Sequence, residues 1–144
     1  MKKILTFGLL IALLAGIYGY FQWNKPHKDT SKISADVVLD ANDLLHAFES
    51  DESKANTQYL DKVIKVNGII KQVENNESGK ITLILATDGE MSSITCNFEP
   101  PAAKGLTQLR QGQQISIKGL CSGALMDDLM GNTVVLDRCS LAQK

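Results

Sequence analysis

Val63-Ile64-Lys65-Val66-Asn67-Gly68-Ile69-Ile70 is the stretch that decides the fold of this 144-residue chain. Its β-branched residues follow the two-residue period of a β-strand, in which successive side chains point to opposite faces. A glycine inside such a pattern marks a bulge or a sharp bend. The stretch therefore predicts one long strand that bends at Gly68.

Similar patterns continue toward the C-terminus. They predict four more strands, over residues 81–85, 93–98, 114–121 and 133–141. Between the third and fourth strands, residues 102–109 are expected to form a short helix after Pro100-Pro101. Five strands, the first long and kinked, with a helix between the third and the fourth, are the order of a five-stranded OB-fold barrel. The alternative is a small open antiparallel sheet packed on the N-terminal helices.

The alternation also predicts which strand residues point inward. They are Ile94, Cys96 and Phe98 on the third strand, and Ile115, Ile117, Gly119 and Cys121 on the fourth. The fifth strand has two conflicting phases, because Val134 and Leu136 indicate one inward face while Val135 and Cys139 indicate the other. A β-bulge would reconcile the two phases.

Two short helices are predicted before the first strand. Asp40 is a suitable N-cap for a helix near residues 41–50, and Asp43 places negative charge in its first turn. A second helix is expected over residues 55–60. With the strands, these helices predict a mainly β domain, an OB-fold barrel with N-terminal helices, over residues 35–144.

Residues 1–23 form a segment suited to a membrane. Met1-Lys2-Lys3 is followed by twenty uncharged residues, Ile4 to Trp23. A helix of that length spans about 30 Å, the thickness of a bilayer's hydrocarbon core. The apolar stretch is longer than that of a secretory signal, and no clean Ala-x-Ala cleavage site precedes its end. We expect an uncleaved transmembrane helix, with a cleaved signal peptide and a buried soluble helix as the alternatives.

Residues 24–34 are polar and contain Pro26, so they are predicted to be a linker. Basic residues flank both ends of the apolar segment, which leaves the positive-inside comparison nearly balanced. A very short N-terminal flank usually stays inside. We therefore expect a single-pass protein whose C-terminal domain lies in the periplasm or outside the cell.

The composition after the anchor argues against broad attraction to polyanions. Residues 24–144 contain 13 Lys and Arg against 16 Asp and Glu, whereas nucleic-acid binders usually present a basic surface. OB barrels bind single strands with aromatic side chains on the second and third strands. From Ile81 to Phe98 the only aromatic residue is Phe98, which is expected to be buried, and Lys and Arg are absent.

No pattern in the sequence predicts catalysis, a metal site or a cofactor. His27 and His46 are expected to be solvated surface residues. Ser122 has no His near it in sequence that would activate it as a nucleophile. Asp51-Glu52 and Asp127-Asp128 lack the alternating ligand spacing of a calcium loop and are expected to be solvated turns.

Several short motifs after the anchor resemble the tRNA_anti-like OB-fold family. They are Asn24-Lys25-Pro26-His27-Lys28-Asp29, Asp51-Glu52, Ala55-Asn56, Tyr59-Leu60-Asp61-Lys62, Val66-x-Gly68, Cys96-x-Phe98, Lys118-Gly119-x-Cys121-x-Gly123 and Val135-Leu136-x-x-Cys139. The resemblance implies a small, exported or membrane-anchored bacterial protein with an OB fold. It implies no tRNA binding and assigns no catalytic residue.

Three cysteines in an exported domain allow one disulfide. A hairpin centred on Met130 would put Cys121 and Cys139 opposite each other, at the spacing that a bridge needs. We therefore expect a Cys121–Cys139 bridge, with Cys96 as a small buried residue. The alternatives are no bridge and a pair that includes Cys96.

These observations predict a membrane-tethered, extracytoplasmic OB-fold module without catalytic activity. It is expected to bind an envelope protein, a peptide or a small molecule. The alternative is a nucleic-acid-binding OB domain, and a weaker third is an exported enzyme with an unrecognised site.

Overall fold

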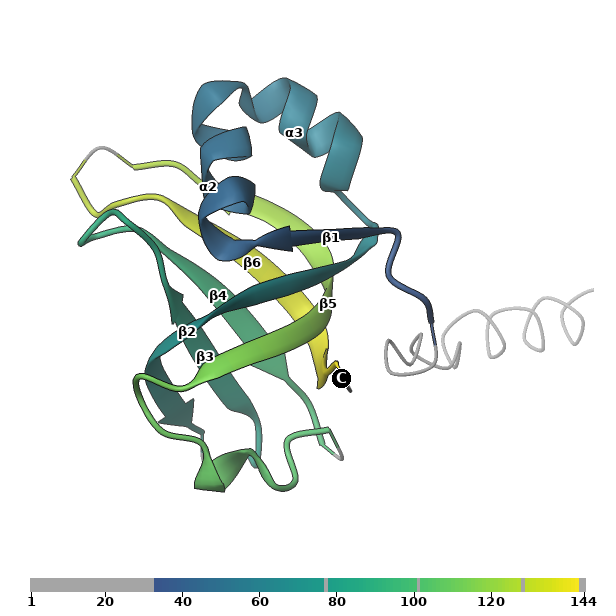
Figure 1. Ribbon diagram of the computed structural model, residues 1–144, viewed down its shortest axis with the longest axis vertical. Helices are drawn as coiled ribbons and strands as arrows, with labels where there is room; N and C mark the ends of the chain where they lie inside the picture. The colour runs from purple at the N-terminus through teal and green to yellow at the C-terminus, as the bar shows by residue number, and fades with distance from the viewer. Residues whose placement is uncertain (1–32, 77, 101, 128, 143–144) are drawn as a thin grey trace, which may run out of the picture.

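The computed structural model describes residues 33–76, 78–100, 102–127 and 129–142. The elements follow in the order β1 (Val37–Asp40), α2 (Ala41–Ser50), α3 (Glu52–Tyr59), β2 (Val63–Asn75), β3 (Ile81–Ala86), β4 (Ser93–Phe98), the 3-10 helix η1 (Leu106–Gln108), β5 (Gln114–Leu125) and β6 (Thr133–Leu141). Figure 1 shows the strands wrapped into a barrel with α2 and α3 over one end.

The predicted membrane segment, residues 1–23, and nearly all of the predicted linker, residues 24–34, lie outside the described residues. Within the described ranges, none of the helices has the length and apolar character needed to cross a bilayer.

Strands β2 to β6 form a closed barrel of mixed pairing. The first half of β2 pairs with β5 and its second half with β3, both antiparallel. Parallel pairing of β4 with β6 completes the ring. This closure confirms the predicted barrel and excludes the open sheet. It is possible because β2 is long enough to pair with β5 along its first half and with β3 along its second half.

An irregularity in β2 accompanies this change of partners, and it lies just beyond Gly68, where the sequence predicted a bend. Gly68 pairs with Ile115 of β5, and the register with β3 shifts between Ile70 and Gln72. A Cβ atom at Gly68 would lie 3.1 Å from Leu85 Cδ1 and 3.2 Å from Ala41 Cβ. The glycine therefore lets the start of α2 and strand β3 approach β2 closely.

Strand β1 was not predicted. It pairs in parallel with the first half of β2, with Val37 opposite Ile64 and Asp40 opposite Asn67. Four residues are too few to show a clear period, so the sequence carried little signal for this strand.

The predicted helix over residues 41–50 is confirmed as α2, and Asp40 takes the N-cap position but makes no side-chain capping bond. The second helix begins earlier than residue 55, because the Asp51 side chain accepts a hydrogen bond from the Lys54 backbone N–H. Figure 1 places both helices over one end of the barrel. They close that end with Phe48 and Tyr59, whose ring centroids lie 6.2 Å apart.

The helix predicted over residues 102–109 is wrong in extent. Only Leu106–Gln108 are helical, as a single 3-10 turn, and Gly105 precedes them with φ of 90°. A left-handed residue cannot continue a right-handed helix, so the glycine interrupts the segment. Leu106 and Ala103 nevertheless pack into the core.

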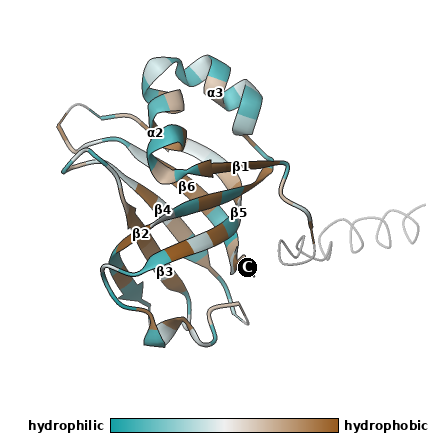
Figure 2. Cartoon of the chain, viewed as in Figure 1, coloured by the Kyte–Doolittle hydropathy of each residue, from teal (hydrophilic) through white to brown (hydrophobic). Residues whose placement is uncertain are grey.

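The barrel interior follows the predicted alternation, and Figure 2 shows hydrophobic and hydrophilic segments alternating along the strands. Ile94, Cys96, Phe98, Ile117 and Cys121 are all fully buried, as expected. On β6, Val134 and Leu136 point inward, and Cys139 is also buried. Arg138, with φ of 51°, changes the phase between them, which is the irregularity that the conflicting pattern required.

The same irregularities make the predicted cysteine register wrong. Cys121 lies opposite Leu136 rather than Cys139, because the β5–β6 register shifts between Cys121 and Gly123 and again between Lys118 and Leu120. Cys96, Cys121 and Cys139 are all free and buried. The hairpin argument for a Cys121–Cys139 bridge assumed a regular ladder, which these shifts break.

Candidate ligand-binding groove

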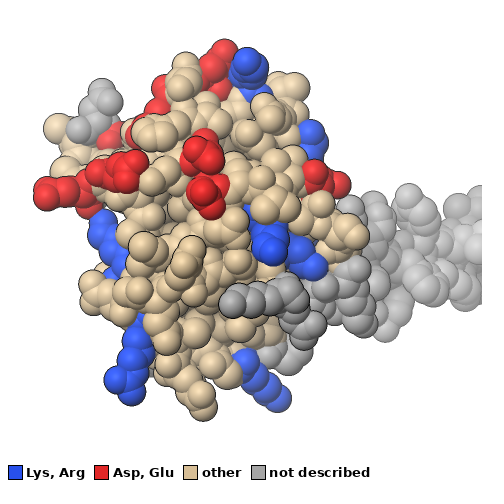
Figure 3. Space-filling model, in the orientation of Figure 1, with Lys and Arg blue, Asp and Glu red and all other residues tan. Residues whose placement is uncertain are grey.

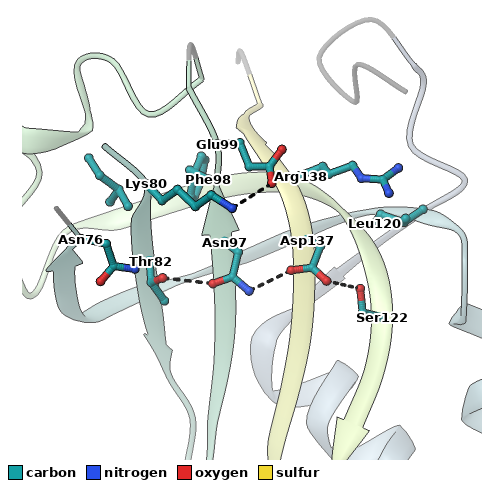
Figure 4. A pocket seen from close by; sticks show the side chains of 11 residues that line it. Asn76, Lys80, Thr82, Asn97, Phe98, Glu99, Leu120, Ser122, Asp137 and Arg138 are labelled. Atoms are coloured by element: carbon teal, nitrogen blue, oxygen red, sulfur yellow. Dashed lines mark hydrogen bonds and ion pairs between the residues drawn. The ribbon is translucent and has the colours of Figure 1, made fainter. Parts of the chain in front are cut away.

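A row of four polar side chains crosses the outer face of the barrel. Thr82 of β3 donates from Oγ1 to Asn97 Oδ1 at 3.0 Å, and Asn97 of β4 donates from Nδ2 to Asp137 Oδ1 at 2.8 Å. Ser122 of β5 donates from Oγ to Asp137 Oδ2 at 2.6 Å. Figure 4 shows the four side chains as a continuous line across four strands, which we call the polar row.

Strand register assembles this row from residues far apart in sequence. Thr82 pairs with Asn97 across β3 and β4. Cys96 pairs with Leu136 in the parallel ladder of β4 and β6. Asn97 follows Cys96 and Asp137 follows Leu136, so the next two residues also lie side by side. The inward neighbours of the row, which include Phe98 and Leu136, are fully buried and fix the strands beneath it.

The polar row lies in a groove of about 350 Å³. Its walls include Asn76, Lys80, Glu99, Leu120 and Arg138. Lys80 Nζ and Glu99 Oε1 form an ion pair at 3.4 Å, with both side chains about half exposed (53% and 47%). Such an exposed pair contributes little to stability and leaves both groups able to exchange partners.

A second hollow of about 410 Å³ continues from this groove and shares Asn76, Lys80 and Ile81 with it. Pro100 and Ala103 give the second hollow an apolar wall, and Lys104 adds a cation at its edge. The first groove is lined mainly by polar side chains and the second hollow mainly by apolar atoms. Small-molecule sites commonly combine the two kinds of lining.

The chemistry of the polar row is that of an acceptor site. Asp137 is its only charged member, and the three hydrogen bonds all run toward this carboxylate. A carboxylate has about four acceptor positions, and only two of those on Asp137 are used by Asn97 and Ser122. The row can therefore accept hydrogen bonds from hydroxyl, amide or ammonium groups of a ligand.

Sequence reasoning weighed Ser122 only as a nucleophile and did not single out Thr82, Asn97 or Asp137. Ser122 Oγ is bonded to Asp137, not to a histidine. His46 is an exposed residue of α2 bonded to Glu49, as predicted for a surface histidine, and His27 lies outside the described residues. The only available signal was that Thr82 and Asn97 occupy outward positions on predicted strands, which does not reveal that they meet.

Features associated with other chemistries are missing from the part of the chain that the structure describes. Its aromatic side chains, Phe48, Tyr59 and Phe98, are all buried, so they offer no surface on which bases could stack. Nor do the described ranges contain three or more His, Cys, Asp or Glu grouped as metal ligands. Of the acidic pairs, Asp51 caps α3, and Asp127 accepts bonds from its own loop.

The buried thiols are poor nucleophiles as well. Burial raises the pKa of Cys121, partly offset by a hydrogen bond from the Gly123 backbone. Burial, followed by the neighbouring Cys96 thiol, raises the pKa of Cys139 well above its usual value. Both cysteines are therefore held as neutral thiols, whereas the thiolate is the reactive form.

Among solved structures, a lipoprotein from Klebsiella pneumoniae, provisionally named as nucleic-acid-binding, is similar to this chain. It is 19% identical with a TM-score of 0.58, over 83% of this chain and 100% of that one. An OBody bound to hen egg-white lysozyme matches at 11% identity and a TM-score of 0.44, over 60% of this chain and 87% of its own. Asparaginyl-tRNA synthetase from Entamoeba histolytica matches at 10% identity and a TM-score of 0.42, over 58% of this chain and 21% of its own.

At these identities the Klebsiella likeness shows the fold alone, which is the OB fold. No curated protein matches the sequence. The profile of the tRNA_anti-like family, in contrast, matches residues 1–139, nearly the whole chain, as the short motifs predicted. This protein is therefore a member of the tRNA_anti-like family.

Proposed function

We propose that this protein is a non-enzymatic binding module that is tethered to a membrane and holds its OB-fold domain outside the cytosol. Its ligand is a small molecule or a peptide that donates hydrogen bonds to the polar row. The observation that carries this proposal is the convergence of Thr82, Asn97 and Ser122 on one carboxylate, Asp137, in an open groove. A neutral or cationic donor group suits that carboxylate.

Two observations support the tether and the location. The twenty uncharged residues from Ile4 to Trp23 have the length of a membrane span. The Klebsiella protein of the same fold is named a lipoprotein, a class held at the cell envelope. Cell fractionation tests the tether: the full-length protein should stay with membranes after a carbonate wash. An N-terminus found between Gly16 and Lys28 would instead indicate a cleaved signal.

The ligand class is tested on the full-length protein in phosphatidylcholine nanodiscs. A fragment library with cationic, neutral and anionic members is screened by ligand-observed NMR. Hits should be mainly cationic or neutral donors, and Asp137→Ala should weaken them about tenfold, the effect of losing one charged hydrogen bond. Thr95→Ala changes the same outer face of β4 outside the row and should leave them unchanged. Mainly anionic hits, or hits indifferent to Asp137→Ala, would count against the proposal.

The alternative function is nucleic-acid binding, which the name of the Klebsiella protein favours. The buried aromatic residues and the absence of Lys and Arg between Ile81 and Phe98 weigh against it. Labelled single-stranded DNA and RNA oligonucleotides separate the two functions. Affinity that falls steeply between 50 and 200 mM salt, as expected when phosphates are neutralised, would favour the alternative.

A further inference from the structure

Four large apolar side chains project into solvent at one end of the barrel. They are Met91 in the β3–β4 turn, Leu125 at the end of β5, and Leu129 and Met130 in the β5–β6 loop, and we call them the apolar tip. Their exposed fractions are 63%, 69%, 84% and 76%. Single exposed apolar residues are ordinary, but a cluster of them marks an interaction surface. Figure 1 shows the turn and the loop side by side, across the barrel from the point where the described chain begins.

The apolar tip is held in place by its own loop. Asp127 Oδ1 accepts hydrogen bonds from the backbone N–H groups of Leu129 at 2.8 Å and Met130 at 2.9 Å. The Asn132 carbonyl accepts a bond from Ser93 N at 3.0 Å, which ties the loop to the start of β4. These bonds hold the backbone of Leu129 and Met130 in place, so little backbone entropy is lost when a partner covers the two side chains.

The two segments of the apolar tip also touch directly. Gly131 lies so close to Met91 that a Cβ atom there would be 2.7 Å from Met91 Cβ and would collide with the Met91 backbone. Gly131 has φ of 89°, a conformation that glycine adopts without strain. The turn and the loop therefore form one surface.

Acidic side chains surround this surface. Glu49 accepts a bond from Asn132 of the loop, Asp88 and Glu90 lie in the turn that carries Met91, and Asp127 is two residues from Leu129. All four are exposed. Two basic residues lie beside them in the described ranges: Lys71 donates to the Glu90 carbonyl, and His46 is bonded to Glu49. Figure 3 shows acidic side chains gathered over the same part of the molecule, with Lys and Arg mostly elsewhere.

We propose that the apolar tip is a docking surface for a segment of another protein that combines apolar side chains with Lys or Arg. The apolar residues of that segment cover Leu129 and Met130, and its cations meet the acidic rim. Charge favours such a segment over the other possible occupants. A second copy of this chain would bring its own acidic rim against this one, and an anionic bilayer would repel the acidic rim. The surface is separate from the polar row, so it adds a protein partner to the proposed function.

The test is selection from a random phage-displayed peptide library on the full-length protein in phosphatidylcholine nanodiscs, with empty nanodiscs as counter-selection. Enriched peptides should combine Lys or Arg with Leu, Ile, Phe or Met. The double variant Leu129→Ser/Met130→Ser should weaken a resynthesised peptide at least about tenfold, as loss of an interface centre does. Val38→Ser and Asp137→Ala should not weaken it. Val38 is the control because, at 59%, it is the most exposed large apolar residue outside the apolar tip within the described ranges.

Several results would overturn this proposal. They are peptides rich in Asp and Glu, no enrichment over empty nanodiscs, and affinity that the double variant leaves unchanged. Analytical ultracentrifugation that detects a dimer lost in the double variant would identify a second copy as the occupant. Capture on phosphatidylglycerol vesicles that depends on Leu129 and Met130 would identify a membrane. An unchanged circular dichroism melting curve shows that the double variant is folded.

Discussion

Apolar side chains occupy two opposite environments in this protein. Inside the barrel, Phe98 and Leu136 are fully buried, whereas Leu129 and Met130 of the apolar tip are 84% and 76% exposed. The interior residues are held by the free energy of removing them from water, about 25 cal/mol per Å² of buried surface. The tip residues gain no such energy in the isolated protein. The difference teaches that hydrophobicity in the sequence does not by itself identify the core, and that the tip can be changed at little cost to folding.

Phe98→Ala should have the largest effect, because it removes a fully buried ring from the barrel. We expect a loss of about 3–5 kcal/mol in the free energy of unfolding, measured by urea denaturation. Leu129→Ala is the matched control, since it also removes apolar atoms but at the tip, and should change the free energy by less than about 0.5 kcal/mol. Equal losses in the two variants would break the comparison.

Gly119→Ala tests how closely the interior is packed. The added Cβ would lie 2.7 Å from Cys139 Sγ and 3.2 Å from Leu136 Cβ. Overpacking a full core costs about 1–3 kcal/mol. A double-mutant cycle with Cys139→Ala checks the cause, because removing Sγ makes room for the new methyl group. If the double variant is as unstable as the sum of the two single variants, the contact with Cys139 is not the source of the loss.

Gly131→Ala should damage the apolar tip and spare the barrel. The residue has a positive φ, and a Cβ there would collide with Met91. We expect a cost of about 1 kcal/mol, because the loop can move away. NMR chemical shifts should change in residues 88–92 and 126–132 and not in β2. Gly112→Ala, which also has a positive φ but no neighbouring atom within 4 Å, is the control for backbone strain alone.

The smallest effect is a dependence of the tip loop on pH. Hydrogen bonds from the backbone of Met130, and then of Leu129, lower the pKa of Asp127 below its ordinary value of 3.8. Because the pKa in the folded state is the lower one, the carboxylate supports the loop above about pH 3.8, and this support is lost as the pH falls through the folded pKa. The amide shifts of Leu129 and Met130 should follow this titration.

Asp127→Asn keeps an acceptor oxygen and removes the titration. The Leu129 and Met130 amide shifts should then be independent of pH over the same range. A titration that persists in this variant would assign the effect to another group.

The fold could be predicted to the extent that it depends on local pattern. The inward positions of Ile94, Cys96 and Phe98 and the position of helix α2 followed from periodicity and capping. What could not be predicted depends on pairing between distant segments. Strand β1 owes its conformation to β2, and the position of Cys139 depends on a bulge whose place the pattern did not give.

The candidate site was less predictable than the fold for the same reason. Asn97 and Asp137 are 40 residues apart in sequence, and they meet because a parallel pairing joins β4 to β6. Polar residues on the outer face of a strand are usually solvated, and their types do not indicate which of them are neighbours. The apolar tip could not be predicted either, since Leu129 and Met130 are of the same apolar residue types as those found in the core.

The three buried thiols lie in three consecutive elements of the sheet, Cys96 in β4, Cys121 in β5 and Cys139 in β6. A thiol reagent reaches a buried cysteine only while the strands around it are open, so the rate of alkylation reports how often that opening occurs. The three cysteines can therefore serve as native probes of local opening of the barrel. Three rates that coincide describe one cooperative opening, and three that differ give the order in which the strands separate.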